Sequence, residues 1–307
     1  VISRIRPCIC IIAETEIWPN LISSLFNLKI PVVIVNARVS DKSFRGYLMA
    51  KYLLKGILRR VSLFCAQSEQ DALRLHSLGV DLGKIIVTGN MKFDQELDPK
   101  SDGISCRLRL FLGDKEKLIV AGSTHRGEEE ILLNVYKGLL TRHPHLRLLI
   151  APRHPQRAPE IGGIIRRAGF NPQRISSISK DRFSPGAVFL LDTIGQLAYF
   201  YAAADIVFVG KSLVRGGGQN ILEPVFAGKP VIFGPFMENF KDIAQLFVEN
   251  KAALMVKNRF ELSCCIEDML GGKIKVESLL ENARMVIKNN QGATKSNIDL
   301  IRNFIVG

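Results

Sequence analysis

Short apolar runs alternate with longer amphipathic segments along most of the chain. Each run is too short for a helix and is bounded by glycine, proline or polar residues, which is typical of buried parallel strands. The sequence predicts such strands at residues 8–13, 32–35, 63–66, 84–87, 118–121, 147–151, 188–191, 206–209, 231–233 and 252–256. Helical patterns follow most of these runs, so the alternation predicts βαβ winding and mostly parallel sheets.

The alternation is interrupted near residues 97–104. This stretch contains Asp98-Pro99 and Asp102-Gly103 and shows no periodicity, which is typical of a junction between domains. A chain of 307 residues is also long for a single hydrophobic core. We therefore expect an α/β protein with a first domain at residues 1–100 and a second at 101–290.

A glycine-rich loop follows the strand predicted at residues 206–209. Gly216, Gly217 and Gly218 lie in this loop, and residues without a Cβ let backbone N–H groups approach an anion closely. Asn220 is expected to cap a helix at residues 221–227 whose positive end faces the loop. The loop is therefore a candidate phosphate site.

Glu223 stands in the first turn of that predicted helix. A carboxylate there either complements the helix dipole or accepts hydrogen bonds from ribose hydroxyls while the loop holds a phosphate, as in dinucleotide folds. The second alternative would make this edge of the sheet a nucleotide site.

Four more loops are expected at the same edge, at residues 122–125, 152–155, 192–196 and 234–239. Arg153 lies between prolines that restrict the backbone. It either binds a phosphate or a carboxylate in a fixed geometry, or it is an exposed arginine without a function. Gly195 either exposes backbone groups to the edge of a base or only tightens a turn. His154 is expected to be structural unless it faces the pocket.

The segment at residues 128–142 predicts a helix that Ser123 or Thr124 caps. Glu128, Glu129 and Glu130 occupy its first turn, where carboxylates complement the helix dipole. We expect no catalytic role for these three acids.

Polar residues also follow the first two strands. Glu14 and Glu16 come after the first strand, and Asn36 and Arg38 come after the second. Ligands of open α/β sheets bind at the carboxyl ends of strands, although the two glutamates could equally belong to the N-terminal cap of a helix at residues 18–28.

The net charge of +13 indicates an anionic partner, which could be a nucleic acid, an anionic lipid or a phosphorylated substrate. Lys51, Lys55 and Arg59 share one helical face beside leucines and aromatic residues, which predicts either an interfacial helix or an ordinary solvated face. No pattern of a known nucleic-acid-binding module is present, so we do not expect a nucleic-acid partner. Six cysteines without CxxC or metal-ligand spacing indicate reduced thiols and no metal site.

Eight motifs in order along the chain resemble those of the Kdo transferases, which add 3-deoxy-D-manno-oct-2-ulosonic acid (Kdo) from CMP-Kdo to a lipid A precursor. The motifs are E-T-E-I-W-P-N (14–20), N-A-R-V-S (36–40), G-N-M-K-F-D (89–94), G-S-T-H-R-G-E-E-E (122–130), A-P-R-H-P (151–155), D-T-I-G-Q-L (192–197), R-G-G-G-Q-N-I-L-E-P (215–224) and G-P-F-M-E-N-F (234–240).

The resemblance implies the GT-B architecture, in which two Rossmann-like domains with parallel sheets face a cleft and a C-terminal helix, here 291–307, crosses back to the first domain. It also implies inverting transfer that needs no metal or other cofactor, at the cytoplasmic face of an anionic inner membrane. The donor-binding residues implied are Pro152, Arg153, Ile194, Gly195, Gln196, Ser212, Gly217, Asn220, Ile221, Leu222 and Glu223. The acceptor-side candidates are Glu14, Glu16, Asn36 and Arg38, and the membrane or lipid patch is Lys51, Lys55 and Arg59.

Two departures from the family pattern affect this prediction. The general-base glutamate of the family and a membrane-associating segment are expected upstream of Val1, so no catalytic base is assigned within the chain. Lys211 and Gln219 stand where many relatives have glycine and histidine. The alternatives are a GT-B enzyme that uses another sugar nucleotide, such as a UDP-sugar, and a nucleotide-binding fragment without turnover.

Overall fold

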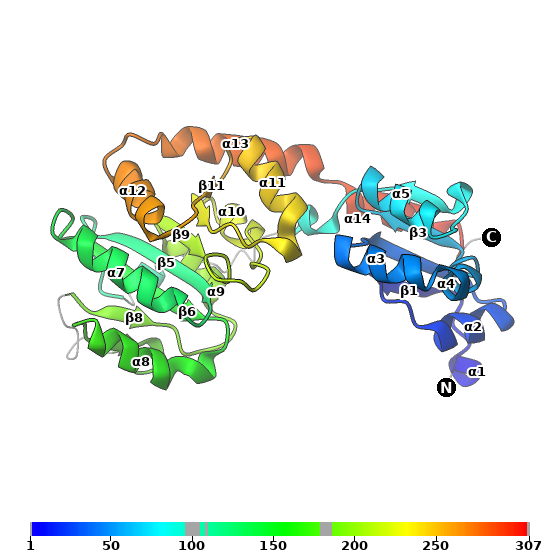
Figure 1. Cartoon of the computed structure of the whole chain (residues 1–307), viewed down its shortest axis with the longest axis horizontal. Coiled ribbons are helices and arrows are strands. Elements are labelled where there is room, and N and C mark those ends of the chain that lie inside the picture. The colour runs from blue at the N-terminus through cyan, green and yellow to red at the C-terminus, as the bar shows by residue number, and fades with distance from the viewer. Residues whose placement is uncertain (1, 96–104, 108–109, 179–185, 306–307) are drawn as a thin grey trace. The chain divides into compact units, whose positions relative to one another are not determined.

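The computed structural model describes residues 2–95, 105–107, 110–178 and 186–305, and it divides the chain into two compact units (Figure 1). Unit 1 comprises Val1–Gln95 together with Ile287–Gly307, and unit 2 comprises Glu96–Val286. Each unit is built on one parallel sheet with helices between its strands. The predicted fold class of two parallel-sheet α/β domains is confirmed.

Unit 1 contains four parallel strands in the order β1-β2-β3-β4. The strands are β1 (Cys10–Ala13), β2 (Val32–Ala37), β3 (Leu63–Ala66) and β4 (Ile85–Val87). The helices are α1 (Ile2–Ile5), α2 (Pro19–Asn27), α3 (Asp41–Met49), α4 (Lys51–Leu58), α5 (Glu69–Ser77) and α14 (Ala293–Arg302). The basic segment forms two helices instead of one, because Ala50 between α3 and α4 departs from helical geometry with φ −95° and ψ 12°.

The sheet of unit 1 is covered on both faces. Ile34 and Phe64 pack in a cluster with Leu58 of α4 and with other residues of α2 and α5. Val33, the neighbour of Ile34 in β2, belongs to a different cluster that packs against Ile301 and its neighbours at the C-terminal end of α14. Successive side chains of a strand point to opposite faces, so the C-terminal helix covers the second face of this sheet.

Asp94 fixes the start of α14. It ends a 3₁₀ turn at Met91–Asp94, and its carboxylate accepts backbone N–H groups from Gly292 at 2.7 Å and from Thr294. Partial burial alone would raise the pKa of Asp94, but these backbone hydrogen bonds outweigh burial and lower the pKa. A residue of the G-N-M-K-F-D motif thus caps a helix almost 200 residues later in the chain, at a sequence separation of 198.

Unit 2 has seven parallel strands in the order β11-β10-β9-β5-β6-β8-β7. The strands are β5 (Lys117–Thr124), β6 (Leu146–Pro152), β7 (Pro172–Arg174), β8 (Val188–Leu190), β9 (Ile206–Val209), β10 (Val231–Phe233) and β11 (Leu254–Met255). The helices are α7 (Glu128–Leu140), α8 (Ala158–Arg167), α9 (Leu197–Ala203), α10 (Leu222–Phe226), α11 (Lys241–Glu249), α12 (Arg259–Leu270) and α13 (Val276–Asn290). Alternate residues of the central strands, such as Ile119 and Ala121, form one buried cluster with residues of α7, α8 and α12.

The order of the strands reverses beside β5. The next strand in the chain, β6, pairs with one edge of β5, whereas β9 pairs with its other edge, with Gly122 opposite Val209. Ligands of open α/β sheets bind outside the carboxyl ends of strands at such a reversal. The loops after β5 and β9 are therefore the place to look for a site.

In the part of the chain that the structure describes, no helix combines the length and the apolar character needed to cross a membrane.

Replacing Asp94 by asparagine tests the cap on α14. We expect Asp94→Asn to lower the free energy of unfolding by about 1 kcal/mol, because one of the two accepting oxygens becomes an NH₂ group that faces a backbone N–H. Trp18, the single tryptophan, lies in unit 1, so its fluorescence during urea unfolding follows the affected unit. Because the pKa of Asp94 is lowered, its contribution is complete above the ordinary aspartate pKa of about 4 and is lost as the pH falls through the lowered value.

Asp299→Asn is the matched control, since Asp299 lies exposed on the same helix and pairs only with Arg302 in the described structure. Equal losses in the two variants, or an Asp94→Asn effect that persists at low pH, would contradict the capping role.

Candidate functional site

The ends of β5 and β9 approach each other very closely. The Gly210 N–H donates to the Gly122 carbonyl at 2.8 Å, and a Cβ on Gly210 would lie 2.6 Å from the Thr124 Cα. Only glycine permits this approach. The contact brings the loop after β9 directly against the loop after β5.

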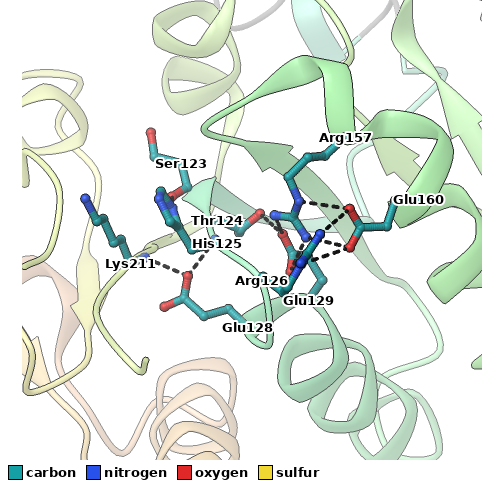
Figure 2. A network of polar contacts seen from close by, with 9 residues as sticks. All are labelled: Ser123, Thr124, His125, Arg126, Glu128, Glu129, Arg157, Glu160 and Lys211. Atoms are coloured by element: carbon teal, nitrogen blue, oxygen red, sulfur yellow. Dashed lines mark hydrogen bonds and ion pairs between the residues drawn. The ribbon is translucent and has the colours of Figure 1, made fainter. Parts of the chain in front are cut away.

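Glu128 holds these two loops together (Figure 2). Its fully buried carboxylate accepts backbone N–H groups from Lys211 at 2.6 Å, Ser212 at 2.9 Å and Leu213 at 3.0 Å. It also accepts the His125 N–H of its own loop at 2.9 Å. Four donors on one buried carboxylate replace the hydration that the charge loses.

Glu129 makes a second buried connection beside the first. Its fully buried carboxylate accepts the Thr124 hydroxyl at 3.0 Å and pairs with Arg157 at 2.8 Å (Figure 2). Burial raises the pKa of Glu129, although Arg157 and Thr124 oppose that change. Arg157 also pairs with Glu160, which pairs with Arg126. This network joins the end of β5 to the turn after β6.

Glu128 and Glu129 lie in the first turn of α7 as predicted, and their carboxylates also make these buried connections, which the sequence analysis did not foresee. The prediction that Ser123 or Thr124 caps the helix is wrong, because Gly127 occupies the N-cap position of α7 without a side-chain bond and Thr124 bonds Glu129 instead. Glu130, which is exposed, fits the original expectation. The signal in the sequence that could have indicated these connections was a run of acids shortly after a buried strand.

The glycine loop packs against residues 234–240. Gly217 and Gly218 have φ of +94° and +73°, and a Cβ on them would lie 2.4 Å from atoms of Asn239 and Met237. The Gly217 carbonyl accepts the Asn239 N–H at 2.8 Å. Close packing against Asn239 and Met237 therefore requires these two glycines. The anion contact that the sequence suggested for them stays a prediction.

Ser212, a predicted donor-binding residue, lies inside the fold. Its hydroxyl donates to the Val209 carbonyl at 2.5 Å and accepts the Gly234 N–H at 2.8 Å, while its own N–H bonds Glu128. A fully buried side chain with these bonds shapes the loop and does not face a ligand.

Glu223 of α10 lies within reach of the charge of Arg153, which follows β6. Desolvation raises the pKa of Glu223, and the Asn220 amide and the Arg153 charge act in the opposite direction. The Asn220 amide donates to Glu223 at 3.4 Å and accepts the Leu222 N–H at 3.1 Å. Helix α10 begins one residue later and ends one residue earlier than predicted, and its N-cap is Ile221.

The remaining predicted donor residues divide between core and surface. Pro152, Ile221 and Leu222 are buried beside the exposed Arg153 and Glu223. Ile194 is 81% exposed, and Gly195 follows it with φ +80° and open space around its Cα. Gln196 accepts the Thr193 hydroxyl at 3.0 Å. An exposed apolar side chain next to an open backbone suits contact with a flat base.

The acceptor-side candidates of unit 1 lie at the carboxyl ends of β1 and β2. Glu14 has φ +60° and pairs with Lys92 at 3.2 Å, and Glu16 accepts the Trp18 indole N–H at 3.2 Å. Asn36 has φ +54° and is buried, with its side-chain oxygen accepting the Met91 N–H at 3.0 Å. Arg38 is half-buried, and its N–H bonds the Thr15 hydroxyl at 2.9 Å.

Four non-glycine residues near the predicted sites have left-handed backbones at strand ends: Glu14, Asn36, Ser123 and Lys211. Such residues cost roughly 1–3 kcal/mol each and cluster at functional sites. The described residues contain no group of three or more His, Cys, Asp or Glu side chains arranged to hold a metal ion.

Comparison with known proteins gives one consistent result. Residues 1–95 match the family model described as 3-deoxy-D-manno-octulosonic-acid transferase (kdotransferase). The 3-deoxy-D-manno-octulosonic acid transferase of Haemophilus influenzae is 36% identical over 99% of this chain and 71% of its own length. The motif resemblance is thereby confirmed.

Solved structures share the fold as well, and two of them are compared below. The C-terminal CMP-Kdo binding domain of WaaA from Acinetobacter baumannii matches with a TM-score of 0.56 and 28% identity, over 60% of this chain and 95% of that domain. The UDP-GlcNAc 2-epimerase from Neisseria meningitidis matches all of this chain and 78% of its own with a TM-score of 0.66, but at 17% identity it shows the fold alone.

Replacing Glu128 by glutamine tests the connection between the two loops. One acceptor oxygen becomes an NH₂ group facing backbone donors, so we expect Glu128→Gln to destabilise unit 2 by about 3 kcal/mol. Hydrogen exchange should also accelerate at the amides of Lys211, Ser212 and Leu213. Glu130→Gln, in the same helical turn but exposed, should change the stability by no more than about 0.5 kcal/mol. Unchanged amide protection in Glu128→Gln would show that other contacts hold the loop.

Proposed function

Because the chain belongs to the 3-deoxy-D-manno-octulosonic acid transferase family, whose members are glycosyltransferases, we propose that it transfers Kdo from CMP-Kdo to the glucosamine disaccharide of a lipid A precursor in lipopolysaccharide biosynthesis. The observation that carries the choice of donor is the match of 60% of this chain to 95% of a solved CMP-Kdo binding domain, at 28% identity. That match agrees with the carboxylate, arginine and open glycine turn at the carboxyl edge of the unit 2 sheet.

In this proposal Glu223 accepts hydrogen bonds from the ribose hydroxyls. Glu223 is accessible to solvent, and the Asn220 amide donates to its carboxylate at 3.4 Å. Arg153 faces the phosphate, since its charge acts close to Glu223 and its backbone N–H is fixed to the Thr124 carbonyl at 3.1 Å. Ile194 and Gly195 contact the cytosine ring.

The proposed reaction is a single inverting displacement. A glucosamine hydroxyl of the acceptor forms the new bond to the anomeric carbon of Kdo while the bond from that carbon to the phosphate oxygen breaks. The hydroxyl proton passes to a base, and CMP departs with the bonding electron pair. If no metal ion takes part, side chains such as Arg153 must offset the charge that develops on CMP.

The basic segment of unit 1 is the proposed membrane contact. Met49, Tyr52 and Leu53 of α3 and α4 are 85%, 97% and 79% exposed, which is unusual for apolar side chains. Lys51 and Lys55 lie on the same short helix, and Arg59 follows it directly. Exposed apolar side chains beside cations are typical of segments that bind anionic membrane surfaces.

A recess beside this segment would suit an acidic headgroup. Lys55 and Arg59 line it together with His76 and Lys84, and its volume is about 580 Å³. We place the protein at the cytoplasmic face of the inner membrane, where it meets its lipid acceptor, with Glu14, Glu16, Asn36 and Arg38 on the acceptor side of unit 1.

Replacing Glu223 by glutamine tests the donor site. Hydrogen bonds to a charged group contribute about 1.5–3 kcal/mol, so we expect Glu223→Gln to weaken CMP binding tenfold or more in calorimetric titration. Glu249→Gln, on the exposed end of α11, should bind CMP as the wild type does. Unchanged affinity in Glu223→Gln would remove this residue from the ribose contact, and tighter binding of UMP than of CMP would indicate a UDP-sugar donor.

Neutralising the basic patch tests the membrane contact. Each cation near an anionic surface contributes about 1 kcal/mol, so the triple variant Lys51→Gln, Lys55→Gln and Arg59→Gln should bind vesicles containing phosphatidylglycerol at least tenfold more weakly. The triple variant Lys257→Gln, Arg259→Gln and Lys275→Gln loses the same charge from exposed positions of unit 2. Equal vesicle binding by the two variants in co-sedimentation at low salt would refute a specific patch.

A further inference from the structure

Three cation-forming side chains gather at the strand reversal of unit 2, beside Glu223 and Arg153 but separate from them. His125 follows β5, His154 follows β6 and Lys211 follows β9. The two imidazole rings are 5.9 Å apart. In Figure 2 the side chains of Ser123, His125 and Lys211 extend to one side, away from the Arg157–Glu160 pair.

One carboxylate, that of Glu128, lies close to this cluster. Glu128 is buried and bonds four backbone N–H groups, including those of His125 and Lys211, so it holds the backbones and not the side chains. Among the described residues, no ion pair joins Lys211, His125 or His154 to an acidic side chain. Burial lowers the pKa of His125, the hydrogen bond to Ser123 and the charge of Glu128 oppose this change, and the charges of Lys211 and His154 add to it. His125 therefore lies within reach of the charges of both Lys211 and His154.

Lys211 occupies a position that favours glycine. Its φ is +57°, in the left-handed region where a long side chain carries a cost, and its aliphatic chain lies over Gly216, where a Cβ would be 2.7 Å from the Lys211 Cγ. Lys29 and Lys251 share such a backbone, so it is the side-chain contact that sets Lys211 apart. Its Cγ, Cδ and Cε atoms all lie within 3.3 Å of that Cβ position, so the side chain runs along Gly216.

We propose that Ser123, His125, His154 and Lys211 form an anion subsite that binds a charged oxygen group of the donor next to its nucleotide. The inference rests on the proposed function, because it assigns a further part of the same donor site. Two groups of a CMP-linked sugar acid have this chemistry: the phosphate and the carboxylate of the sugar. Lys211 and His125 are specificity-determining residues that select a donor carrying such a group at this position.

The test compares three ligands that differ in charged groups: cytidine has neither, CMP has the phosphate, and CMP-Kdo has the phosphate and the sugar carboxylate. Affinities are measured by calorimetry for the whole chain and for Lys211→Gly, Lys211→Asn and His125→Gln. Glycine and asparagine tolerate the left-handed backbone at position 211, so these variants remove the cation without new strain. Arg126→Gln is the matched control, since Arg126 lies in the same loop but pairs with Glu160.

We expect the Lys211 and His125 variants to lose about tenfold in affinity for CMP-Kdo and to bind cytidine as the wild type does. A parallel loss for CMP identifies the phosphate as the bound group, and full retention of CMP binding identifies the sugar carboxylate. Lys211→Gly should keep or raise the thermal midpoint while it loses affinity, a combination that a purely structural lysine would not produce. Arg126→Gln should retain all three affinities.

Two results would overturn the subsite: unchanged binding of both CMP and CMP-Kdo in the variants, or an equal loss for cytidine. A wild-type chain that binds none of the three ligands would instead overturn the proposed function, and the subsite with it. The two failures are thus distinguishable.

Discussion

The buried carboxylate of Glu128 is the interaction on which the candidate site depends. It joins the first turn of α7 to the loop after β9, at the point where the strand order of unit 2 reverses. An ionised group in the interior is tolerated only with several hydrogen bonds, and here four backbone N–H groups supply them. The same bonds hold the N–H groups of Lys211, Ser212 and Leu213 away from any ligand. Side chains, not these amides, must therefore provide the charge that faces an anion.

This arrangement gives a physical reason for the strained residues around it. A loop whose backbone N–H groups are hydrogen-bonded to Glu128 has little freedom in φ and ψ. Ser123 and Lys211, which lie in the two segments that Glu128 joins, adopt left-handed backbones. Unit 1 shows a related feature, because Asn36 combines a left-handed backbone with a buried amide that bonds Met91. Glu14, Asn36, Ser123 and Lys211 lie at the carboxyl ends of strands, where open sheets bind ligands, whereas Lys29 and Lys251 have the same backbone just after helices.

The sequence was sufficient for the elements that depend on local pattern. The buried strands are short apolar runs between polar residues, and β3 was predicted without error at residues 63–66. The partners of buried charges could not be predicted, because their signal is not local. Glu128 and Lys211 are 83 residues apart, and a glutamate in a first helical turn already has an adequate explanation in the helix dipole. The helix cap failed for a similar reason, since Thr124 forms its bond within the buried network and leaves Gly127 at the N-cap. The roles of Glu223 and Arg153 stay predictions, although Glu223 lies within reach of the charge of Arg153.

The return of the chain into unit 1 has an energetic reason. Val33, Val35, Leu63 and Cys65 form one apolar face of the unit 1 sheet, and residues at the end of α14 pack on this face. Burying a single valine or leucine side chain contributes roughly 1.5–3 kcal/mol, so a bare face of this size would weaken the unit substantially. The hydrogen bonds of Asp94 to the start of α14 direct the helix onto that face. Unit 2 thus lies within the sequence of unit 1, and Leu300, Ile301 and Phe304 belong to the core of the first sheet together with its strands.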